Sequence, residues 1–332
     1  MFPPNILITN YCNQNCSFCF ARAEMNTKTI DREMELINFK RILIKMKSLR
    51  IDTVKLLGGE PMLHSRLDQI LALSLAHFPY VQIFSNGIFS DDKAMLVSKY
   101  FPRIKFTFNV TTPGFQLNQK IRQRVIRHIT DFALKTEVTL SLTIDITTDI
   151  DFVVKTITKK VLRSAKHIRI GFSNPTAGKK NYYSFNQFPM MGKQLYKFIK
   201  TVRDAKTHAQ LHLNCGFTRC MFTDEEYNYL TKQGLQFLGW GCFGKGSSMD
   251  IATNMSAFHC FPLSTKHRLS LTAHSLVKID QTLMKKRYDY WGKINQKVCQ
   301  KCPFYGHVPS KCPGPCIAFI INGVNNQSKS SS

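Results

Sequence analysis

The stretch that decides the fold is NILITNYCNQNCSFC, residues 5–19. A run of β-favouring residues is followed by a polar loop with three cysteines within eight residues, Cys12, Cys16 and Cys19. Such a loop can wrap one corner of a cubane iron-sulfur cluster and bind three of its irons, which leaves the fourth iron open to an exogenous ligand. The alternatives are reduced thiols or part of a zinc site, although zinc motifs usually pair their cysteines two by two. We therefore expect a cluster that takes part in chemistry.

Outward from this loop, short β-favouring runs alternate with helical segments to about residue 175, which predicts six βα units and a parallel sheet. The predicted strands are Asn5–Thr9, Thr53–Leu57, Val81–Ser85, Ile104–Val110, Thr139–Ile144 and His167–Phe172. The predicted helices are Asp31–Ser48, Ser65–His77, Asp91–Lys99, Leu117–Leu134 and Ile150–Ser164, with Asp31, Asp91 and Asp149 as N-caps. Six units are too few for a closed barrel, so the pattern alone allows a partial barrel or a doubly wound sheet.

A second motif, Gly58-Gly59-Glu60-Pro61, follows the second predicted strand. Glycines allow the backbone to approach a ligand closely, and Pro61 would fix the turn. Taken alone, the motif is equally well explained as a tight turn in a βα loop.

In order and spacing, the two motifs resemble the radical S-adenosylmethionine (radical SAM) superfamily. Cys12, Cys16, Phe18 and Cys19 match its Cys-x3-Cys-x-aromatic-Cys loop position by position. The resemblance implies a partial (βα)6 barrel, a [4Fe-4S] cluster on the three cysteines and S-adenosylmethionine chelated to the open iron. It also implies that Phe18 lies against the adenine and that the Gly58-Gly59-Glu60 segment recognises the methionyl ammonium. Reductive cleavage of the sulfonium would give methionine and a 5'-deoxyadenosyl radical that abstracts a substrate hydrogen.

Polar residues end the later strands as well. Ser85 and Asn86 stand where the resembled family often has Thr-Asn, so we expect them to contact the cofactor or substrate, with an ordinary turn as the alternative. Asn109, Thr143 and Asp145 fall at the C-terminal ends of predicted strands, where ligands bind in parallel sheets, although polar caps would explain them almost as well. The sequence identifies no catalytic residue beyond the cofactor ligands.

The C-terminal region holds eight cysteines: Cys215, Cys220, Cys242, Cys260, Cys299, Cys302, Cys312 and Cys316. They resemble the SPASM extension of peptide-modifying radical SAM enzymes, which implies one or two auxiliary [4Fe-4S] clusters. Departures from that pattern are the nine residues between Cys302 and Cys312 in place of five, Met255 in place of a glycine, and the absence of a cysteine after Cys316. Cys215 or Cys220 is the candidate for the missing last ligand. A structural zinc ribbon, or one cluster with unligated thiols, is the alternative.

These patterns predict four parts of the chain. They are a radical SAM partial barrel at 1–180, a bridging segment at 181–211 with a helix from about Met191 to Ala205, a Cys-rich SPASM-like iron-sulfur domain at 212–324, and a polar, disordered tail at 325–332.

Length and composition are those of a folded, soluble protein. The 332 residues, 43% of them hydrophobic, can bury a full core, and no apolar run approaches the length of a membrane span. No secretory signal follows Met1, so we expect a cytoplasmic protein whose eleven cysteines bind metal instead of forming disulfides. The formal charge of +25 favours an anionic partner, but cluster-bound thiolates and solvated lysine faces account for much of it, so nucleic acid is an unfavoured partner.

The leading functional hypothesis is hydrogen abstraction from a peptide or protein side chain, giving a thioether, a carbon-carbon crosslink, an epimerised residue or an oxidised one. Because only eleven residues precede Cys12, we expect a separate leader-peptide-binding protein or the basic surface to recognise the substrate. The resemblance implies a low-potential electron donor, flavodoxin or ferredoxin. The second hypothesis is radical SAM modification of a nucleotide, RNA or small metabolite. The third is a non-catalytic zinc or iron-sulfur protein.

Overall fold

The computed structural model describes residues 3–25, 32–145, 148–157, 159–173, 184–214, 217–235, 249–290, 297–306, 312 and 314–321. Within them, one sheet of ten strands has the order β10-β9-β8-β1-β2-β3-β4-β5-β6-β7. The strands are β1 Asn5–Thr9, β2 Thr53–Gly58, β3 Tyr80–Ser85, β4 Ile104–Asn109, β5 Val138–Ile144, β6 His167–Phe172, β7 Gln210–Leu213, β8 Met249–Ile251, β9 Ser256–His259 and β10 Leu269–Ser270.

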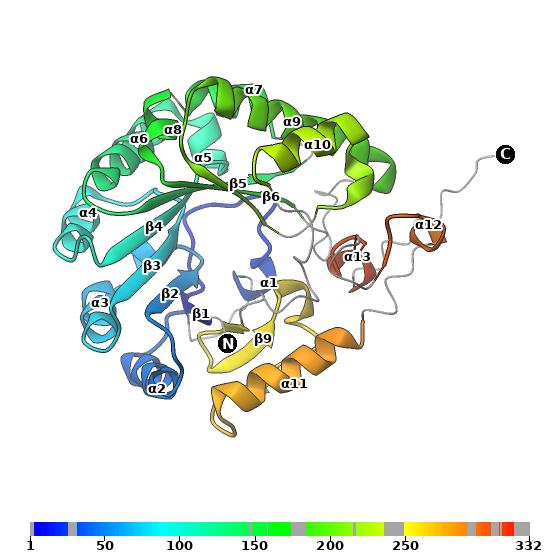
Figure 1. Ribbon diagram of the computed structural model, residues 1–332. Helices are drawn as coiled ribbons and strands as arrows, with labels where there is room; N and C mark the ends of the chain where they lie inside the picture. The colour runs from blue at the N-terminus through cyan, green and yellow to red at the C-terminus, as the bar shows by residue number, and fades with distance from the viewer. Residues whose placement is uncertain are drawn as a thin grey trace.

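The sheet curves into an arc, as Figure 1 shows, and along its outer side lie helices such as α2 (Leu36–Lys47), α3 (Leu67–Leu75), α4 (Asp91–Ser98), α6 (Gln119–Ala133) and α7 (Ile150–Thr156). Strands β1 to β7 are all parallel and follow one another in sequence order, without the reversal of a doubly wound sheet. The partial barrel expected from the sequence is therefore confirmed and the doubly wound alternative is wrong. The seventh strand, β7, was not predicted.

Thirteen α-helices lie in the described part of the chain. They are α1 Arg22–Met25, α2 Leu36–Lys47, α3 Leu67–Leu75, α4 Asp91–Ser98, α5 Pro113–Leu117, α6 Gln119–Ala133, α7 Ile150–Thr156, α8 Lys159–Ser164, α9 Phe188–Asp204, α10 Asp224–Lys232, α11 Leu276–Tyr288, α12 Lys297–Gln300 and α13 Ala318–Ile321. In the described ranges none of them is long and apolar enough to cross a membrane.

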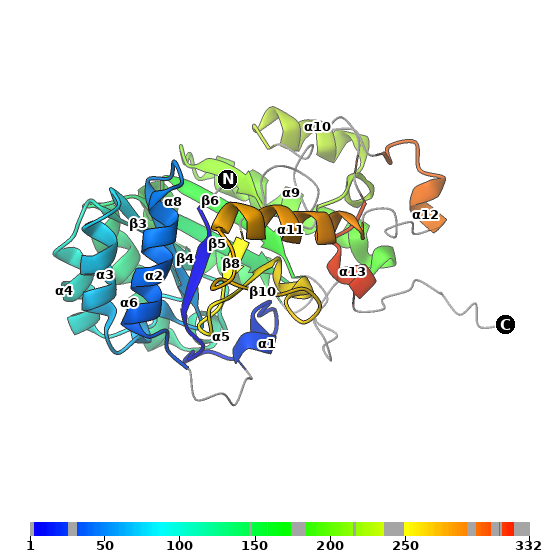
Figure 2. The same ribbon diagram turned by 90° about the horizontal axis from the view of Figure 1, so that it is seen from below.

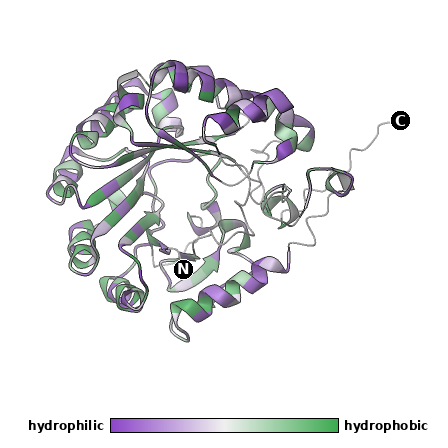
Figure 3. Ribbon diagram, in the orientation of Figure 1, coloured by the Kyte–Doolittle hydropathy of each residue, from purple (hydrophilic) through white to green (hydrophobic). Residues whose placement is uncertain are grey.

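The hydrophobic periodicity of each element explains its place. In α2 the buried residues are Phe39, Ile42, Leu43 and Met46, one stripe at helical spacing that packs into the main core. Along β5, buried and partly buried residues alternate. Figure 3 shows hydrophobic and hydrophilic residues interleaved along the outer helices, as expected for helices with one face on the sheet and one in solvent.

Several helix boundaries differ from the expectation: α2 begins at Leu36, with Glu35 at its N-cap position, and not at Asp31, and α9 begins at Phe188 and not at about Met191. Ser90, not Asp91, caps α4, because its side chain accepts the hydrogen bond from the Lys93 backbone N–H. Asp149 does cap α7, and Asp31 lies outside the described residues. Asn118 caps α6 and so divides the predicted Leu117–Leu134 helix from the short α5 before it. The predicted Ile150–Ser164 helix is likewise divided into α7 and α8.

The C-terminal part of the chain returns to the first strand. Strand β8 pairs in parallel with β1 and β9 pairs antiparallel with β8, while α11 packs over β9 (Figure 2). The predicted boundary at residue 212 falls inside β7, which belongs to the sheet. The division into domains otherwise stays a prediction.

One buried carboxyl joins β8 to β1. Asp250 accepts a hydrogen bond from Asn5 Nδ2 at 2.7 Å. Burial raises the pKa of Asp250 to about 7, although Asn5 and the charge of Lys55 both act to lower it. The folded protein therefore keeps this proton to a higher pH than the unfolded chain does.

We expect this carboxyl to make stability fall as pH rises. Its contribution is complete below about pH 4 and is lost as pH rises through 7, at roughly 1.4 kcal/mol per pH unit. Asp250→Asn cannot titrate, so the difference in unfolding free energy between wild type and variant should shrink with that slope and become constant above pH 7. Urea unfolding at half-unit pH steps measures it, and a difference independent of pH would contradict the expectation.

Candidate active site

The cysteine loop leaves the C-terminal end of β1 and lies partly buried. The Cys19 N–H donates to the Cys16 carbonyl at 3.3 Å, and the Gln14 N–H points at Cys12 Sγ at 3.4 Å. Burial is the main cause that raises the pKa of Cys12 to about 11 and that of Cys16 to about 12, and the charge of Cys19 adds to both. The three thiols are therefore near enough to repel one another when ionised. Such thiols ionise readily only when a cation binds them.

The Gly58-Gly59-Glu60-Pro61 loop lies directly against the cysteine loop. The Gly59 N–H donates to the Thr9 carbonyl at 2.7 Å and the Glu60 N–H to the Tyr11 carbonyl at 2.8 Å. A Cβ at Gly58, whose φ is +155°, would lie 2.3 Å from the Thr9 oxygen, and one at Gly59 would lie 2.1 Å from the Tyr11 oxygen. Both glycines are thus required for contact between the two loops. The sequence suggested only that glycines there let the backbone approach a ligand, so the contact is a second reason for glycine at these positions.

Gly59→Ala is therefore expected to destabilise the protein by roughly 3 kcal/mol or more. The added Cβ would meet the backbone of Tyr11, and neither of the two backbone segments can shift without breaking hydrogen bonds. Gly234→Ala is the matched control: its φ is +83°, but nothing lies within 4 Å of the added Cβ, so about 1 kcal/mol is expected. Urea unfolding of the two variants compares them. Equal, small losses would show that the loops are not held together at Gly59.

Glu60 connects the ends of two strands from a fully buried position. Its carboxylate accepts hydrogen bonds from the Met62 N–H at 3.1 Å, Ser85 Oγ at 2.8 Å and the Asn86 N–H at 2.7 Å. Burial raises the pKa of Glu60 to about 7 against these three bonds, each of which lowers it. Pro61 begins the 3-10 turn η1 (Pro61–Leu63) that follows.

Ser85 and Asn86, predicted from the end of the third strand, lie beside the cysteine loop. Asn86 Nδ2 donates to Asn13 Oδ1 at 2.8 Å and lies 3.9 Å from Cys12 Sγ. The Gly87 N–H donates to Ser85 Oγ at 2.9 Å. The structure thus brings the residues from the ends of β1, β2 and β3 together at one edge of the sheet.

The remaining predicted polar residues divide into two kinds. Asp145, at the end of β5, accepts a hydrogen bond from Ser17 Oγ at 2.5 Å and so reaches the cysteine loop. Asn109 instead accepts from the N–H and hydroxyl of Thr111, and Thr111 in turn accepts from the Thr143 N–H. These local bonds match the polar-cap alternative for Asn109.

Several residues that hold the loop were not predicted. Gln14 Oε1 accepts from the Gly114 N–H at 2.8 Å, and Asn13 Nδ2 donates to the Ile88 carbonyl at 2.7 Å. The available signal was the polar composition between the cysteines. Phe18, predicted to face adenine, is 7% exposed.

Four of the C-terminal cysteines lie near one another: Cys220, Cys299, Cys302 and Cys312. Cys260 comes directly before the short helix η4 (Phe261–Leu263) and Cys316 two residues before α13, and these two helices contact each other. Cys215 and Cys242 fall outside the described residues. Among the residues that are described, no three His, Cys, Asp or Glu side chains are arranged to hold a single metal ion.

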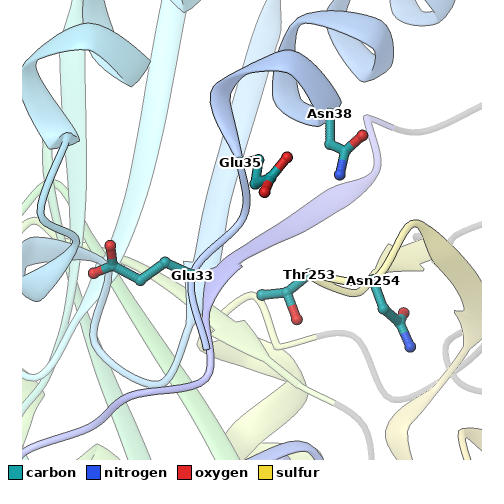
Figure 4. A pocket seen from close by; sticks show the side chains of 5 residues that line it. All are labelled: Glu33, Glu35, Asn38, Thr253 and Asn254. Atoms are coloured by element: carbon teal, nitrogen blue, oxygen red, sulfur yellow. The ribbon is translucent and has the colours of Figure 1, made fainter. Parts of the chain in front are cut away.

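A polar pocket has no cysteine in its lining. Figure 4 shows the five residues that line it: Glu33, Glu35, Asn38, Thr253 and Asn254. The Glu33 carboxylate accepts from the backbone N–H and hydroxyl of Ser65. Carboxylates and amides without thiols or imidazoles do not match the donors of an iron-sulfur site, so this pocket is not a candidate for it.

Comparison with known proteins locates the family resemblance. Residues 6–136 match the sequence model of the radical SAM superfamily. Over 87 residues the chain is 34% identical to the 7,8-dihydro-6-hydroxymethylpterin dimethyltransferase of Methanocaldococcus jannaschii, which is 25% of this chain and 17% of that protein. Over 92 residues it is 28% identical to the sporulation killing factor maturation protein SkfB of Bacillus subtilis, which is 27% of this chain and 22% of that protein. The matches thus span less than a quarter of these two relatives.

Among solved structures, Streptococcus suis SuiB bound to S-adenosylmethionine is similar over 96% of this chain and 74% of its own, with a TM-score of 0.69 and 15% identity. SuiB bound to its precursor peptide SuiA gives a TM-score of 0.68 at 14% identity, over 96% of this chain and 73% of that one. At such identities the likeness concerns the fold, which extends beyond the segment matched by sequence.

Proposed function

Because residues 6–136 belong to the radical SAM superfamily, we propose that the protein cleaves S-adenosylmethionine reductively and abstracts hydrogen from a peptide or protein side chain. The cleavage of S-adenosylmethionine is supported by one observation: the loops after β1, β2 and β3 meet. Hydrogen bonds join Glu60, Asn86 and the cysteine loop. Members of this superfamily use a [4Fe-4S] cluster and S-adenosylmethionine.

The donor set fits that cofactor pair. Three thiols lie close together on one loop, those of Cys12, Cys16 and Cys19. They would bind three irons of the cluster and leave the fourth for the methionyl group of S-adenosylmethionine. When bound, the pair supplies one-electron cleavage of the sulfonium bond. The carboxylate of Glu60, with the Gly58-Gly59 backbone, would bind the methionyl ammonium, and Phe18 would lie against adenine. Ser85 and Asn86 would then hold Glu60 and the cysteine loop in place.

A peptide substrate is supported by two comparisons. SkfB is a maturation protein for a killing factor, and SuiB has been solved with a precursor peptide. The C-terminal cysteines would supply one or two auxiliary clusters, and a flavodoxin or ferredoxin would supply the electron. The similarity to a pterin dimethyltransferase supports a small-molecule substrate instead, so substrate class has to be tested directly.

The test is release of 5'-deoxyadenosine by anaerobically reconstituted protein under dithionite. Rates are compared without substrate, with a panel of precursor-like peptides, and with nucleotides and pterins. We expect release in all three and stimulation by peptides together with a changed peptide mass. Stimulation by nucleotides or pterins alone would overturn the peptide assignment, and no release at all would overturn the radical chemistry.

A further inference from the structure

An arginine joins the barrel to the C-terminal cysteine loop. Arg219 begins the short helix η3 (Arg219–Met221) shortly after β7, and its guanidinium lies 4.4 Å from the Tyr227 ring centre and 4.7 Å from that of Phe304. Its side chain is 12% exposed, pairs with Asp224 and donates to the Phe222 carbonyl at 2.7 Å. A guanidinium that contacts two rings and also donates to a carbonyl is held in direction as well as in position.

One of the two rings that Arg219 contacts, that of Phe304, belongs to the C-terminal cysteine segment. Phe304 lies between Cys302 and Cys312 in sequence, and its carbonyl accepts from the Cys312 N–H at 2.8 Å. The Cys302 N–H donates to the Cys299 carbonyl at 3.0 Å. Phe304 is thus bonded to Cys312 and lies two residues after Cys302, so holding Phe304 positions the backbone near both thiols.

Cys220 follows Arg219 directly and supplies a fourth thiol. Cys220 is exposed, and its Sγ lies 3.2 Å from Thr218 Oγ1. Burial, followed by the charges of Cys220, Cys312 and Cys302, raises the pKa of Cys299 to about 12. The thiols thus converge from two segments that lie about 80 residues apart in sequence.

We propose that Cys220 completes a four-thiolate iron-sulfur site with Cys299, Cys302 and Cys312, and that Arg219 positions this site through Phe304. The proposal rests on the auxiliary clusters of the proposed function and assigns one of them. Each thiol releases its proton as its sulfur bonds to iron. Because four protein thiolates leave no iron open, this cluster transfers electrons and does not bind substrate.

The ligand assignment is tested by Cys220→Ala, with Cys260→Ala as the matched control from the other cysteine group. Iron and sulfide are counted after anaerobic reconstitution, and the reduced clusters are observed by electron paramagnetic resonance. Cys220→Ala should lose between about one and about four irons and change the signal of one auxiliary cluster, while Cys260→Ala should leave that signal intact. An unchanged signal and iron count in Cys220→Ala would overturn the assignment. So would zinc in the purified protein that Cys220→Ala releases.

The role of Arg219 is tested by the reduction potential of the same cluster. A nearby positive charge favours the reduced, more negative state, so Arg219→Gln should lower the potential and Arg219→Lys should restore part of it. Arg103→Gln is the control, because the Arg103 guanidinium likewise donates to backbone carbonyls, but these belong to Leu75, Phe78 and Pro79 on the barrel. Equal potentials in wild type and Arg219→Gln would overturn the role. Neither measurement uses S-adenosylmethionine, so failure here is distinct from failure to release 5'-deoxyadenosine.

Discussion

Replacing Cys12, Cys16 and Cys19 together by alanine is expected to remove about four irons and to reduce 5'-deoxyadenosine release to background, while the auxiliary clusters remain. The reason lies in the separation of the cysteines. These three lie on the loop after β1, whereas Cys220, Cys299, Cys302 and Cys312 form a group of their own. Anaerobic iron and sulfide counts beside the release assay measure both effects on one preparation.

The matched variant is Cys299/Cys302/Cys312→Ala, which removes the same number of thiols from the other group. It should also lose about four irons, but the loaded loop after β1 should still cleave S-adenosylmethionine when dithionite supplies the electron. If the first variant kept cleaving, the cysteine loop would not be the reactive site. If both variants lost every iron, the two groups would not be independent.

Acid should weaken iron binding by the reactive loop for a related reason. Burial holds the thiol pKa of Cys12 near 11 and that of Cys16 near 12, so binding must displace protons at any neutral pH. Metal affinity of such a site falls as pH decreases.

The elements near the reactive loop were predictable because their signals are local. Short β-favouring runs placed the ends of β1 to β6 within one residue, and the cysteine spacing identified the loop. Strand β8 was missed because three residues, Met249–Ile251, show no periodicity, and their pairing with β1 spans about 245 residues of sequence. Strand β7, Gln210–Leu213, has only four residues, and so short an alternation of polar and apolar residues does not distinguish a strand from a loop.

The contacts that hold the site were less predictable than its cysteines. Ser17 bonds to Asp145 and Gln14 to Gly114, each across about 100 residues or more, and a single sequence contains no sign of such pairs. The reason for Gly58 and Gly59 was also incomplete. A glycine signals that something approaches closely, but only the folded chain shows that the Thr9 and Tyr11 carbonyls do so.

Glu60→Gln is expected to weaken S-adenosylmethionine binding by about tenfold or more and to destabilise the apo protein by about 1–3 kcal/mol. The wild-type carboxylate accepts at both oxygens: Met62 N–H and Ser85 Oγ bind Oε1, and the Asn86 N–H binds Oε2. A carboxamide has one oxygen. Whichever way it turns, its NH2 group faces a backbone N–H, and a buried donor is left without an acceptor.

Glu33→Gln is the control, since Glu33 also accepts from a backbone N–H and a serine hydroxyl, at Ser65, but a third of its side chain is exposed to water. Glu33→Gln should lower the free energy of unfolding by less than about 1 kcal/mol and leave the affinity for S-adenosylmethionine unchanged. Isothermal titration and urea unfolding measure the two quantities, and similar losses in both variants would contradict the role of burial. The contrast should also depend on pH. Burial raises the pKa of Glu60 to about 7, so the folded protein keeps a proton that the unfolded chain has lost, and the unfolding free energy of wild type relative to Glu60→Gln should fall by roughly 1.4 kcal/mol per pH unit as pH rises toward 7 and be constant above it.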